Sequence, residues 1–167
     1  MIFWIVCAVI LLFAFVIFFG APYLPTKRHQ VAVALELLQV RAGATIVDLG
    51  SGDGILLKAA ARQGAVVYGY ELNPILCAVS WLRCLRYRQQ VHIRCANFWH
   101  VELPADTTGV YIFLLHRYMK RLDDKMTTEA KRLGHTVQLA SFTFAIPGKQ
   151  AAAVRDGVFL YTYSGKH

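Results

Sequence analysis

The sequence predicts an α/β fold with a mostly parallel sheet of six or seven strands, preceded by one N-terminal transmembrane helix. Three observations carry this prediction. Short apolar runs rich in β-branched residues alternate with helical patterns over most of the chain. A cluster of glycines at positions 50–54 directly follows the first of these runs. The first 19 residues carry no charged side chain.

The composition limits the class of protein. The 167 residues suffice for one domain of ordinary size. Hydrophobic residues make up 56% of the chain and charged residues 17%, which excludes an intrinsically disordered protein. A net charge of +8 suits an anionic membrane surface, RNA or an acidic partner, and its sign alone does not choose among them.

Residues 1–20 are the predicted membrane anchor, because about 20 apolar helical residues cross a hydrocarbon core of about 30 Å. A cleaved signal peptide is the alternative, but the chain shows neither a basic start nor a small-residue cleavage site. Lys27 and Arg28 follow the anchor, which predicts a single-pass protein with its C-terminal portion on the cytoplasmic side. The absence of an Arg/Ser-rich transit segment favours a bacterial inner membrane over a mitochondrial one.

The chain after the anchor divides into a linker and pre-motif helix at 21–43 and a main domain at 44–167. Prolines break the first helix, and glycines end several of the later ones. The last two strands have no clear helix between them, so we expect one of them to be antiparallel at the edge of the sheet. The expected helices lie at about 26–41, 54–63, 74–87 and 118–133, and the expected strands at 45–49, 65–70, 91–95, 108–115, 135–145 and 157–163.

The glycine turn after the first strand is the strongest local signal for a ligand site. Its glycines let the backbone approach a ligand closely, at the edge of the sheet where open α/β folds bind ligands. A dinucleotide fingerprint needs a third glycine where this chain has Ile55. The carboxylates of Asp48 and Asp53 would also repel a pyrophosphate. They would attract a cationic ligand such as S-adenosylmethionine.

Two further positions fit the same ligand. Glu71 ends the second strand, where a carboxylate can accept hydrogen bonds from ribose hydroxyls, although it could also simply stabilise the next helix. Asn97 follows the third strand, and its polar side chain could contact an adenine amino group. Phe98 or Trp99 would then flank the adenine ring. Core packing of the two aromatic rings and a turn role for Asn97 are the alternatives.

His116 is the candidate catalytic residue, because it follows the fourth strand and could deprotonate a substrate amine. A purely structural histidine is the alternative. A second open case is the group Arg83, Arg86 and Arg88 with Trp81 and Tyr87, which suits either a solvated helix end or a contact with a membrane surface.

The cysteines give no sign of cross-linking or metal binding. Cys7, Cys77, Cys84 and Cys95 form no C-x-x-C pair and no zinc-like cluster. We therefore expect no disulfide and no metal.

Three motifs carry a resemblance to a known family. Pro22-Tyr23-Leu24-Pro25-Thr26, the turn Asp48-Leu49-Gly50-Ser51-Gly52-Asp53-Gly54, and Gly69-Tyr70-Glu71-Leu72-Asn73-Pro74 follow a single apolar segment. Together they resemble the membrane-anchored class I S-adenosylmethionine-dependent protein-lysine methyltransferases of the adenine nucleotide translocase and the ATP synthase c-subunit. The resemblance covers residues 20–100 well.

The resemblance implies a Rossmann-like class I methyltransferase fold, S-adenosyl-L-methionine as cofactor, and a set of binding residues. One position and one three-residue segment depart from the family: Asn97 replaces an aspartate, and Leu114-Leu115-His116 replaces Phe-Gly-Val. The expected cofactor-binding residues are Thr26, Asp48, Gly50, Ser51, Gly52, Asp53, Glu71, Asn73, Asn97 and Phe98.

The predicted function is a protein-lysine N-methyltransferase acting on a membrane or membrane-adjacent protein. A methyltransferase for an apolar small molecule or lipid, and a cofactor-binding protein without catalysis, are the alternatives. Nucleic acid is not the expected partner, because the (Asp/Asn)-Pro-Pro-(Tyr/Phe) motif of base methyltransferases is absent after the fourth strand.

Overall fold

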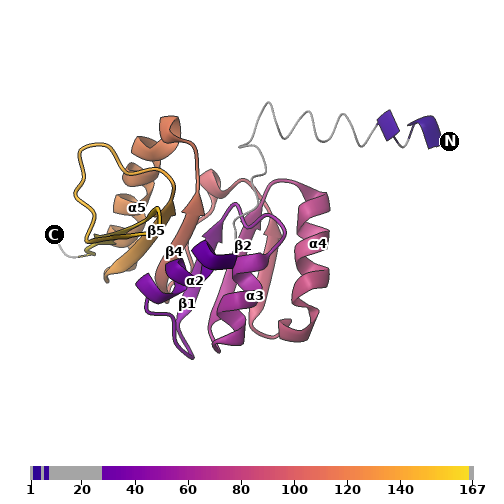
Figure 1. Cartoon of the computed structure of the whole chain (residues 1–167), viewed down its shortest axis with the longest axis horizontal. Helices are drawn as coiled ribbons and strands as arrows, with labels where there is room; N and C mark the ends of the chain where they lie inside the picture. Colours follow the sequence, from indigo (N-terminus) through magenta and orange to yellow (C-terminus); the bar gives the residue numbers. More distant parts are fainter. Residues whose placement is uncertain (1, 5, 8–27, 166–167) are drawn as a thin grey trace.

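The computed structural model describes residues 2–4, 6–7 and 28–165, and strands alternate with helices along the last of these ranges (Figure 1). The strands are β1 (Thr45–Leu49), β2 (Val66–Glu71), β3 (Val91–Cys95), β4 (Thr107–Phe113), β5 (Val137–Phe142), β6 (Ala153–Arg155) and β7 (Val158–Tyr163). The α-helices are α2 (Arg28–Leu37), α3 (Ile55–Arg62), α4 (Pro74–Cys84) and α5 (Met119–Leu133). Short 3-10 helices are η1 (Leu85–Tyr87), η2 (Phe98–His100) and η3 (His116–Tyr118).

The strands form one seven-stranded sheet in the order β3-β2-β1-β4-β5-β7-β6. The five strands from β3 to β5 are parallel, and β7 pairs antiparallel with both β5 and β6. This arrangement confirms the predicted Rossmann-like, mostly parallel sheet. The prediction of an antiparallel strand is also confirmed, but its place at the edge is wrong, because β6 lies outside β7.

Strand β6 was not expected from the sequence, although a short signal for it exists. Asp156 and Gly157 form a two-residue connection to β7 with φ of 48° and 77°. Positive φ at both positions is typical of the tight turns that join antiparallel strands, and Asp-Gly is a preferred pair there. The strand has only three residues, too few for an alternating pattern to stand out.

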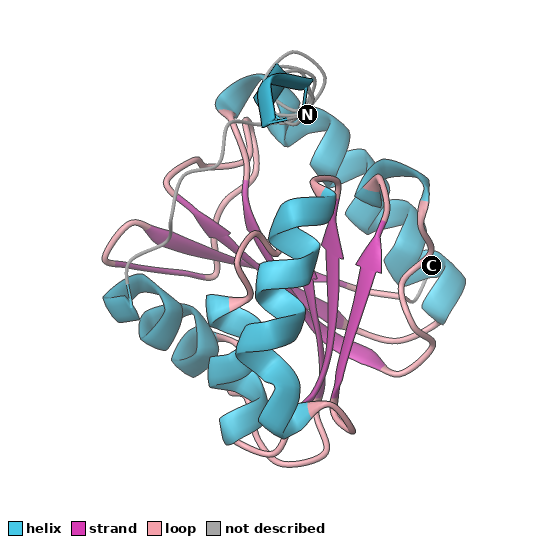
Figure 2. Cartoon of the chain, turned by 90° about the vertical axis from the view of Figure 1, so that its right-hand side faces the viewer, coloured by secondary structure: helices cyan, strands magenta, loops and turns pink. Residues whose placement is uncertain are grey.

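Helices cover both faces of the sheet, and each face has its own hydrophobic core (Figure 2). Helices α2 and α3 pack on one face, where Leu35 and Leu57 are among the buried residues. Helix α5 packs on the other, where Met119 and Leu122 are fully buried. Every residue of β1 is buried, as expected for a central parallel strand between two helical layers.

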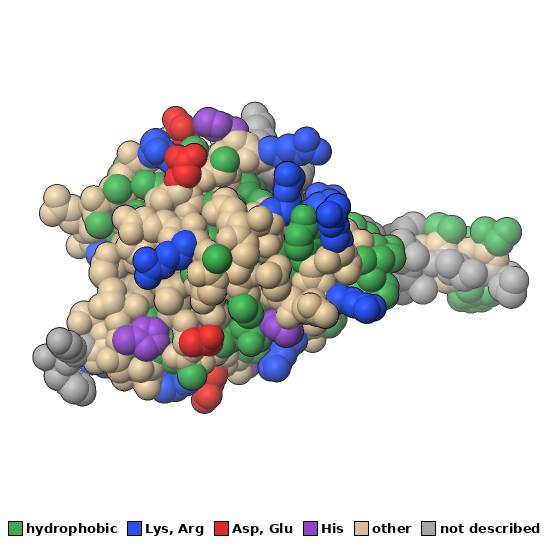
Figure 3. Space-filling model, turned by 90° about the horizontal axis from the view of Figure 1, so that it is seen from below, with side chains coloured by type: hydrophobic (Ala, Val, Ile, Leu, Met, Phe, Trp, Pro, Cys, Tyr) green, Lys and Arg blue, Asp and Glu red, His purple; other side chains and the backbone are tan. Residues whose placement is uncertain are grey.

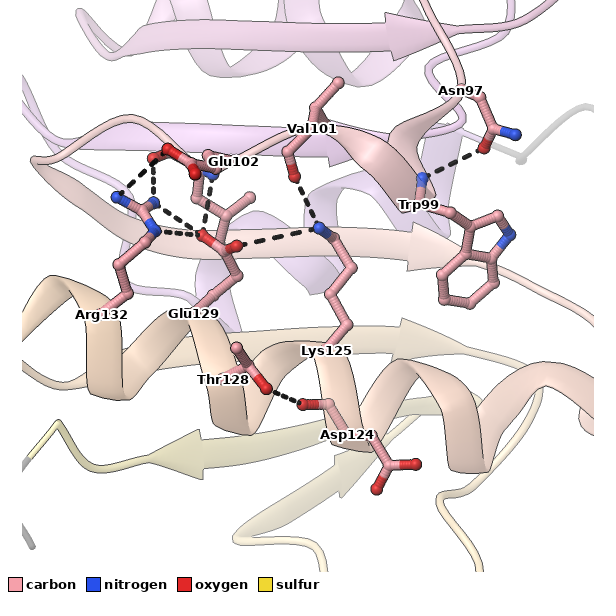
Figure 4. A network of polar contacts seen from close by, with 10 residues as sticks. Asn97, Trp99, Val101, Glu102, Asp124, Lys125, Thr128, Glu129 and Arg132 are labelled. Carbon is pink, nitrogen blue, oxygen red and sulfur yellow. Dashed lines mark hydrogen bonds and ion pairs between the residues drawn. The ribbon is translucent and has the colours of Figure 1, made fainter.

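A polar network ties the loop after η2 to helix α5 (Figure 4). The buried carboxylate of Glu129 accepts hydrogen bonds from the backbone N–H of Leu103 at 2.9 Å and from Arg132 at 2.6 Å. The ammonium of Lys125 donates to the carbonyl of Val101 at 2.6 Å. Burial lowers the pKa of Lys125, and the nearby Glu129 opposes that shift. The network holds residues 101–103 against α5.

No helix among residues 2–4, 6–7 and 28–165 is long and apolar enough to cross a membrane. Most of the predicted anchor at 1–20 lies outside the described residues, and Thr26 lies outside them as well. Helix α2, the described part of the expected pre-motif helix, packs against α3, β5 and β7.

Asp123 on α5 gives a pH-dependent prediction for the stability of this face. Its carboxylate accepts hydrogen bonds from Lys149 Nζ at 2.8 Å and from Tyr163 Oη at 2.7 Å. Burial acts to raise the pKa of Asp123, but these two hydrogen bonds and the lysine charge outweigh it and lower the pKa. The bonds therefore stabilise the fold above the ordinary carboxyl pKa of about 3.9, and this stabilisation is lost as the pH falls through the lower pKa of the folded state.

We expect Asp123→Asn to lower the free energy of unfolding by about 1–2 kcal/mol at pH 7. The difference from the unmodified chain should begin to shrink below about pH 4, where this carboxylate becomes protonated in the unfolded chain, and it should disappear as the pH falls through the lower pKa of the folded state. Urea unfolding of both chains between pH 3 and pH 7 measures this. Asp124→Asn is the matched control, because Asp124 is exposed and 3.7 Å from its partner Lys120. An equal loss in both variants would contradict the assignment.

Candidate functional site

The carboxyl ends of four parallel strands meet at one edge of the sheet. Leu49 at the end of β1 pairs with Tyr70 of β2 and with Ile112 of β4, and Glu71 pairs with Cys95 of β3. The loops that follow these strands therefore lie side by side. They hold the glycine turn, the Glu71–Asn73 segment, residues 96–99 and residues 114–116. All site residues predicted from the sequence within residues 28–165 lie in these loops or at the strand ends that enter them.

The glycine turn needs its glycines for backbone conformation and for close packing. Gly50, Gly52 and Gly54 have φ of 93°, 53° and 77°, which a side chain would strain. A Cβ on Gly54 would lie 2.2 Å from Ser80 Oγ, so this glycine also lets α4 approach the turn. A Cβ on Gly50 would meet no atom within 4 Å, which leaves space next to the backbone there. The turn thus presents open backbone to a ligand.

Glu71 braces the turn against the end of β2. Its carboxylate accepts one hydrogen bond from the backbone N–H of Gly52 at 2.9 Å and one from that of Asn73 at 2.8 Å. The carbonyl of Tyr70 adds two more, from the backbone N–H groups of Gly50 at 2.8 Å and Ser51 at 3.0 Å. A carboxylate oxygen can accept more than one hydrogen bond, so Glu71 retains acceptor capacity for a ligand.

Asp48 lies beneath the turn with 3% of its surface exposed. Burial raises its pKa well above the ordinary carboxyl value, and the nearby charges of Glu71 and Asp53 raise it further. An ionised Asp48 is therefore costly in the protein without ligand. A cation bound near the turn would offset that cost, because an opposite charge favours the ionised form.

Asp53 has a partner that the sequence did not indicate. Its carboxylate forms an ion pair with Arg83 Nη2 at 2.7 Å and accepts a hydrogen bond from the backbone N–H of Ile55 at 3.3 Å. Arg83 comes from the last turn of α4, far along the chain from the glycine turn. The arginine largely balances the Asp53 charge, so Glu71 supplies the unbalanced negative charge of the site, and Asp48 adds to it when a bound cation favours its ionised form.

Asn73 connects the site to the start of α4. Asn73 is buried and caps α4, because its side-chain oxygen accepts from the backbone N–H of Ile75 at 2.9 Å. The same residue donates its own N–H to Glu71. Ser51 Oγ and Ser80 Oγ are buried hydroxyls without a hydrogen-bond partner among the described residues.

Asn97 and Trp99, in the segment after β3, have different surroundings. Asn97 caps η2, with its side-chain oxygen accepting from the backbone N–H of Trp99 at 3.1 Å. Figure 4 shows the side-chain nitrogen of Asn97 pointing away from that bond. Trp99 packs toward α5, with the guanidinium of Arg121 4.3 Å from its ring centre. The ring of Phe98 lies 4.7 Å from that of Trp99. Core packing thus accounts for Trp99, whereas Asn97 keeps a free donor.

His116 is exposed at the start of η3, directly after β4. Its ring lies 6.2 Å from that of Phe144, which follows β5. Because β4 is the neighbour of β1, the histidine belongs to the same edge as the glycine turn.

Two residues of the site were missed from the sequence, Ser80 and Arg83, because nothing in their local pattern shows what they face. No group of His, Cys, Asp or Glu among the described residues could hold a metal ion.

Comparisons with known proteins agree with this arrangement. The family model described as the ANTKMT methyltransferase domain matches residues 48–153, which include the glycine turn and Glu71. The ATP synthase c-subunit lysine N-methyltransferase of Xenopus laevis is 38% identical over 110 residues, covering 65% of this chain and 48% of the relative. The chain thus spans about half the length of such vertebrate relatives. A protein-lysine N-methyltransferase of Saccharolobus islandicus is 30% identical over 158 residues, covering 87% and 95% of the two chains.

A solved structure has the same fold. An RNA methyltransferase from Salinibacter ruber in complex with S-adenosyl-L-homocysteine superposes with a TM-score of 0.74, covering 84% of this chain and 92% of that one at 23% identity. The resemblance noted from the three motifs is therefore confirmed at the level of family and fold. On its sequence, its sheet and its braced glycine turn, this chain belongs to the ANTKMT methyltransferase-domain family.

Proposed function

We propose that the chain is an S-adenosyl-L-methionine-dependent protein-lysine N-methyltransferase. The observation that carries the proposal is the glycine turn, braced by Glu71 and set over the buried Asp48. This arrangement combines open backbone with unbalanced negative charge, which suits a ligand that is cationic and carries a ribose. The names of the relatives support lysine as the acceptor.

The proposed cofactor contacts follow the order of the strands. Glu71 accepts hydrogen bonds from the ribose hydroxyls, and Gly50 lets the cofactor approach the backbone. Asp48 places negative charge near the ammonium and sulfonium groups. Asn97 and Phe98 contact the adenine, with the free side-chain nitrogen of Asn97 suited to a ring nitrogen. The shape of these loops depends on four further residues of the predicted set: Ser51, Gly52, Asp53 and Asn73. Thr26 is the expected contact near the methionine end of the cofactor.

The chain must also prepare the acceptor. S-adenosylmethionine supplies a methyl group on a sulfonium, and transfer needs a neutral amine aligned with it. A lysine ammonium must therefore lose its proton first. His116 is the proposed base, because it lies at the end of β4 on the edge that carries the glycine turn.

The proposed location is a membrane, with residues 1–20 as a single-pass anchor and the catalytic domain on the cytoplasmic side. A bacterial inner membrane is the first choice and a mitochondrial one the second. The proposed organisation is an anchor at 1–20, a linker and pre-motif helix at 21–43, and a methyltransferase domain at 44–167. Resistance of the expressed chain to carbonate extraction, with protease access from the cytoplasmic side, tests the anchor and its orientation.

The proposed reaction is tested by incubating the full chain with methyl-labelled cofactor and membranes of its host. Label in protein, recovered as methyllysine after acid hydrolysis, supports the proposal. Label in the organic phase would instead identify a lipid or apolar small molecule as acceptor, and label in RNA a nucleic acid. Cofactor binding by calorimetry without any transfer would identify a non-catalytic binding protein.

Glu71→Gln tests whether the hydrogen bonds of the Glu71 carboxylate support cofactor binding. The variant loses the carboxylate charge and has an NH2 donor in place of one acceptor oxygen, so the backbone N–H of Gly52 or of Asn73 loses its partner. We expect the Kd for S-adenosylmethionine to rise at least tenfold, measured by calorimetry, in line with about 1.5–3 kcal/mol for hydrogen bonds to a charged group. Glu102→Gln is the control, because the side chain of Glu102 is 78% exposed. Unchanged affinity in both variants would exclude Glu71 from the cofactor site.

Asp48→Asn is expected to separate stability from binding. The raised pKa of Asp48 means that the folded chain loses stability as the pH rises above the unfolded-state value of about 3.9. The variant does not titrate, so its Tm relative to the unmodified chain should increase from pH 4 toward pH 7. Its affinity for the cationic cofactor should fall over the same range. Thermal melts and calorimetry measure the two effects, and a fall in both Tm and affinity at pH 7 would contradict this role.

His116→Gln tests the proposed base. We expect kcat to fall by roughly 10²-fold or more, the usual contribution of a positioned acid or base, while the Kd for cofactor stays unchanged. His100→Gln is the control, since His100 is exposed after β3. An unchanged kcat in His116→Gln would assign the proton to water and His116 to the shape of the opening.

A further inference from the structure

Helix α4 exposes an apolar face to solvent. Val79, Trp81, Leu82 and Leu85 are 38%, 56%, 60% and 42% exposed. Only Ser80 and Cys84 of this helix are buried. Among residues 28–165, five large hydrophobic side chains are exposed, and four of them lie within the seven positions 79–85. The fifth is Val154, on β6 at the opposite edge of the sheet. The exposed apolar side chains are thus concentrated on α4 and on η1, which directly follows it.

The outward residues share one side of the helix. Ala78, Leu82 and Leu85 recur at intervals of four and three, the spacing of one helical face, and Trp81 lies beside them. Helix α5 shows the usual arrangement instead, since it buries Met119, Leu122 and Met126 and carries exposed charges such as Lys120 and Lys131. A solvent-facing apolar stripe on a helix normally marks an interaction surface.

The charged residues in the chain segment that carries this stripe are all basic. Residues 72–101 contain Arg83, Arg86, Arg88 and Arg94 and no aspartate or glutamate. Arg83 turns inward to Asp53, while Arg86 and Arg88 are exposed after the end of α4. Figure 3 shows basic and hydrophobic side chains gathered on the right-hand side of the domain, which is the side of α4 in Figure 1.

We propose that the outward face of α4 and η1 docks on the surface of an anionic lipid bilayer. Tryptophan and leucine enter the headgroup boundary in such contacts, and exposed arginines attract anionic lipids. A second copy of the chain is a poorer fit, because the arginines of two copies would face each other without acidic partners. An acidic protein would match the charge but not the contiguous apolar stripe at its centre.

Docking through α4 also fixes the orientation of the domain. The helix begins after Asn73, which belongs to the loop that braces the glycine turn, and is about 16 Å long. The candidate site therefore lies within about one helix length of the docked surface. The inference rests on the surface of α4 and does not require the proposed catalytic function.

The test measures contact of Trp81 with lipid in the full chain. Residues 1–20 are expected to hold the chain on vesicles in any case, so the readout is the position of α4 rather than partition. Trp4→Phe removes the tryptophan of that segment and leaves Trp81 and the half-buried Trp99. The variant is bound to vesicles of phosphatidylcholine, alone or mixed with phosphatidylserine, each carrying brominated lipid as quencher.

We expect stronger quenching in the mixed vesicles, and loss of that difference when Trp81→Phe is added. Arg86→Gln with Arg88→Gln should reduce the docked population, by about fivefold for each arginine. Lys120→Gln with Lys131→Gln is the control, because it removes the same charge from exposed positions of α5. Equal quenching in the two kinds of vesicle would overturn the proposal.

A second measurement identifies other occupants of the face. Aqueous acrylamide should quench Trp81 freely in detergent solution without lipid. Protection that grows with protein concentration at a fixed ratio of detergent to protein would show that a second copy covers α4. That result would overturn the proposal. Neither measurement involves cofactor, so a failure of the proposed methyl transfer would not affect the outcome.

Discussion

The carboxylate of Glu71 is the group on which the rest of the site depends. It accepts the backbone N–H of Gly52 from the loop after β1 and that of Asn73 from the loop after β2. One buried side chain thus joins the loop after β1 to the loop after β2. Leaving two buried amides without partners would cost about 1–3 kcal/mol each, which explains why the turn keeps a defined shape without ligand.

The hydrogen bonds of Glu71 hold several carboxylates close together in a largely buried region of the protein. Asp48, Asp53 and Glu71 converge on the glycine turn, and Arg83 is the cation paired with one of them. The raised pKa of Asp48 is the energetic consequence, since burial and neighbouring carboxylates both disfavour its ionised form. Such a cluster lowers the stability of the empty protein and favours a cationic ligand, a pattern that functional sites often show.

Helix α4 connects this site to the outer surface. Its first turn is capped by Asn73, Ser80 packs against Gly54, and Arg83 pairs with Asp53, so its inner side shapes the turn. Its outer side carries the apolar stripe with Trp81 and Leu82. A lipid contact on the outer side therefore acts on the element that shapes the ligand site.

The sequence by itself determined the alternation of strands and helices, the glycine turn and the acidic end of β2, because each depends on neighbours within a few positions. Only the tertiary structure decided the partner of Asp53 and the direction in which the apolar side of α4 faces. It also decided that β7 lies inside β6, and that Trp99 packs with Arg121 rather than at the site edge. These features join residues far apart in the chain, and local patterns do not specify which surfaces of two elements will meet when the sheet and its two helical layers pack together.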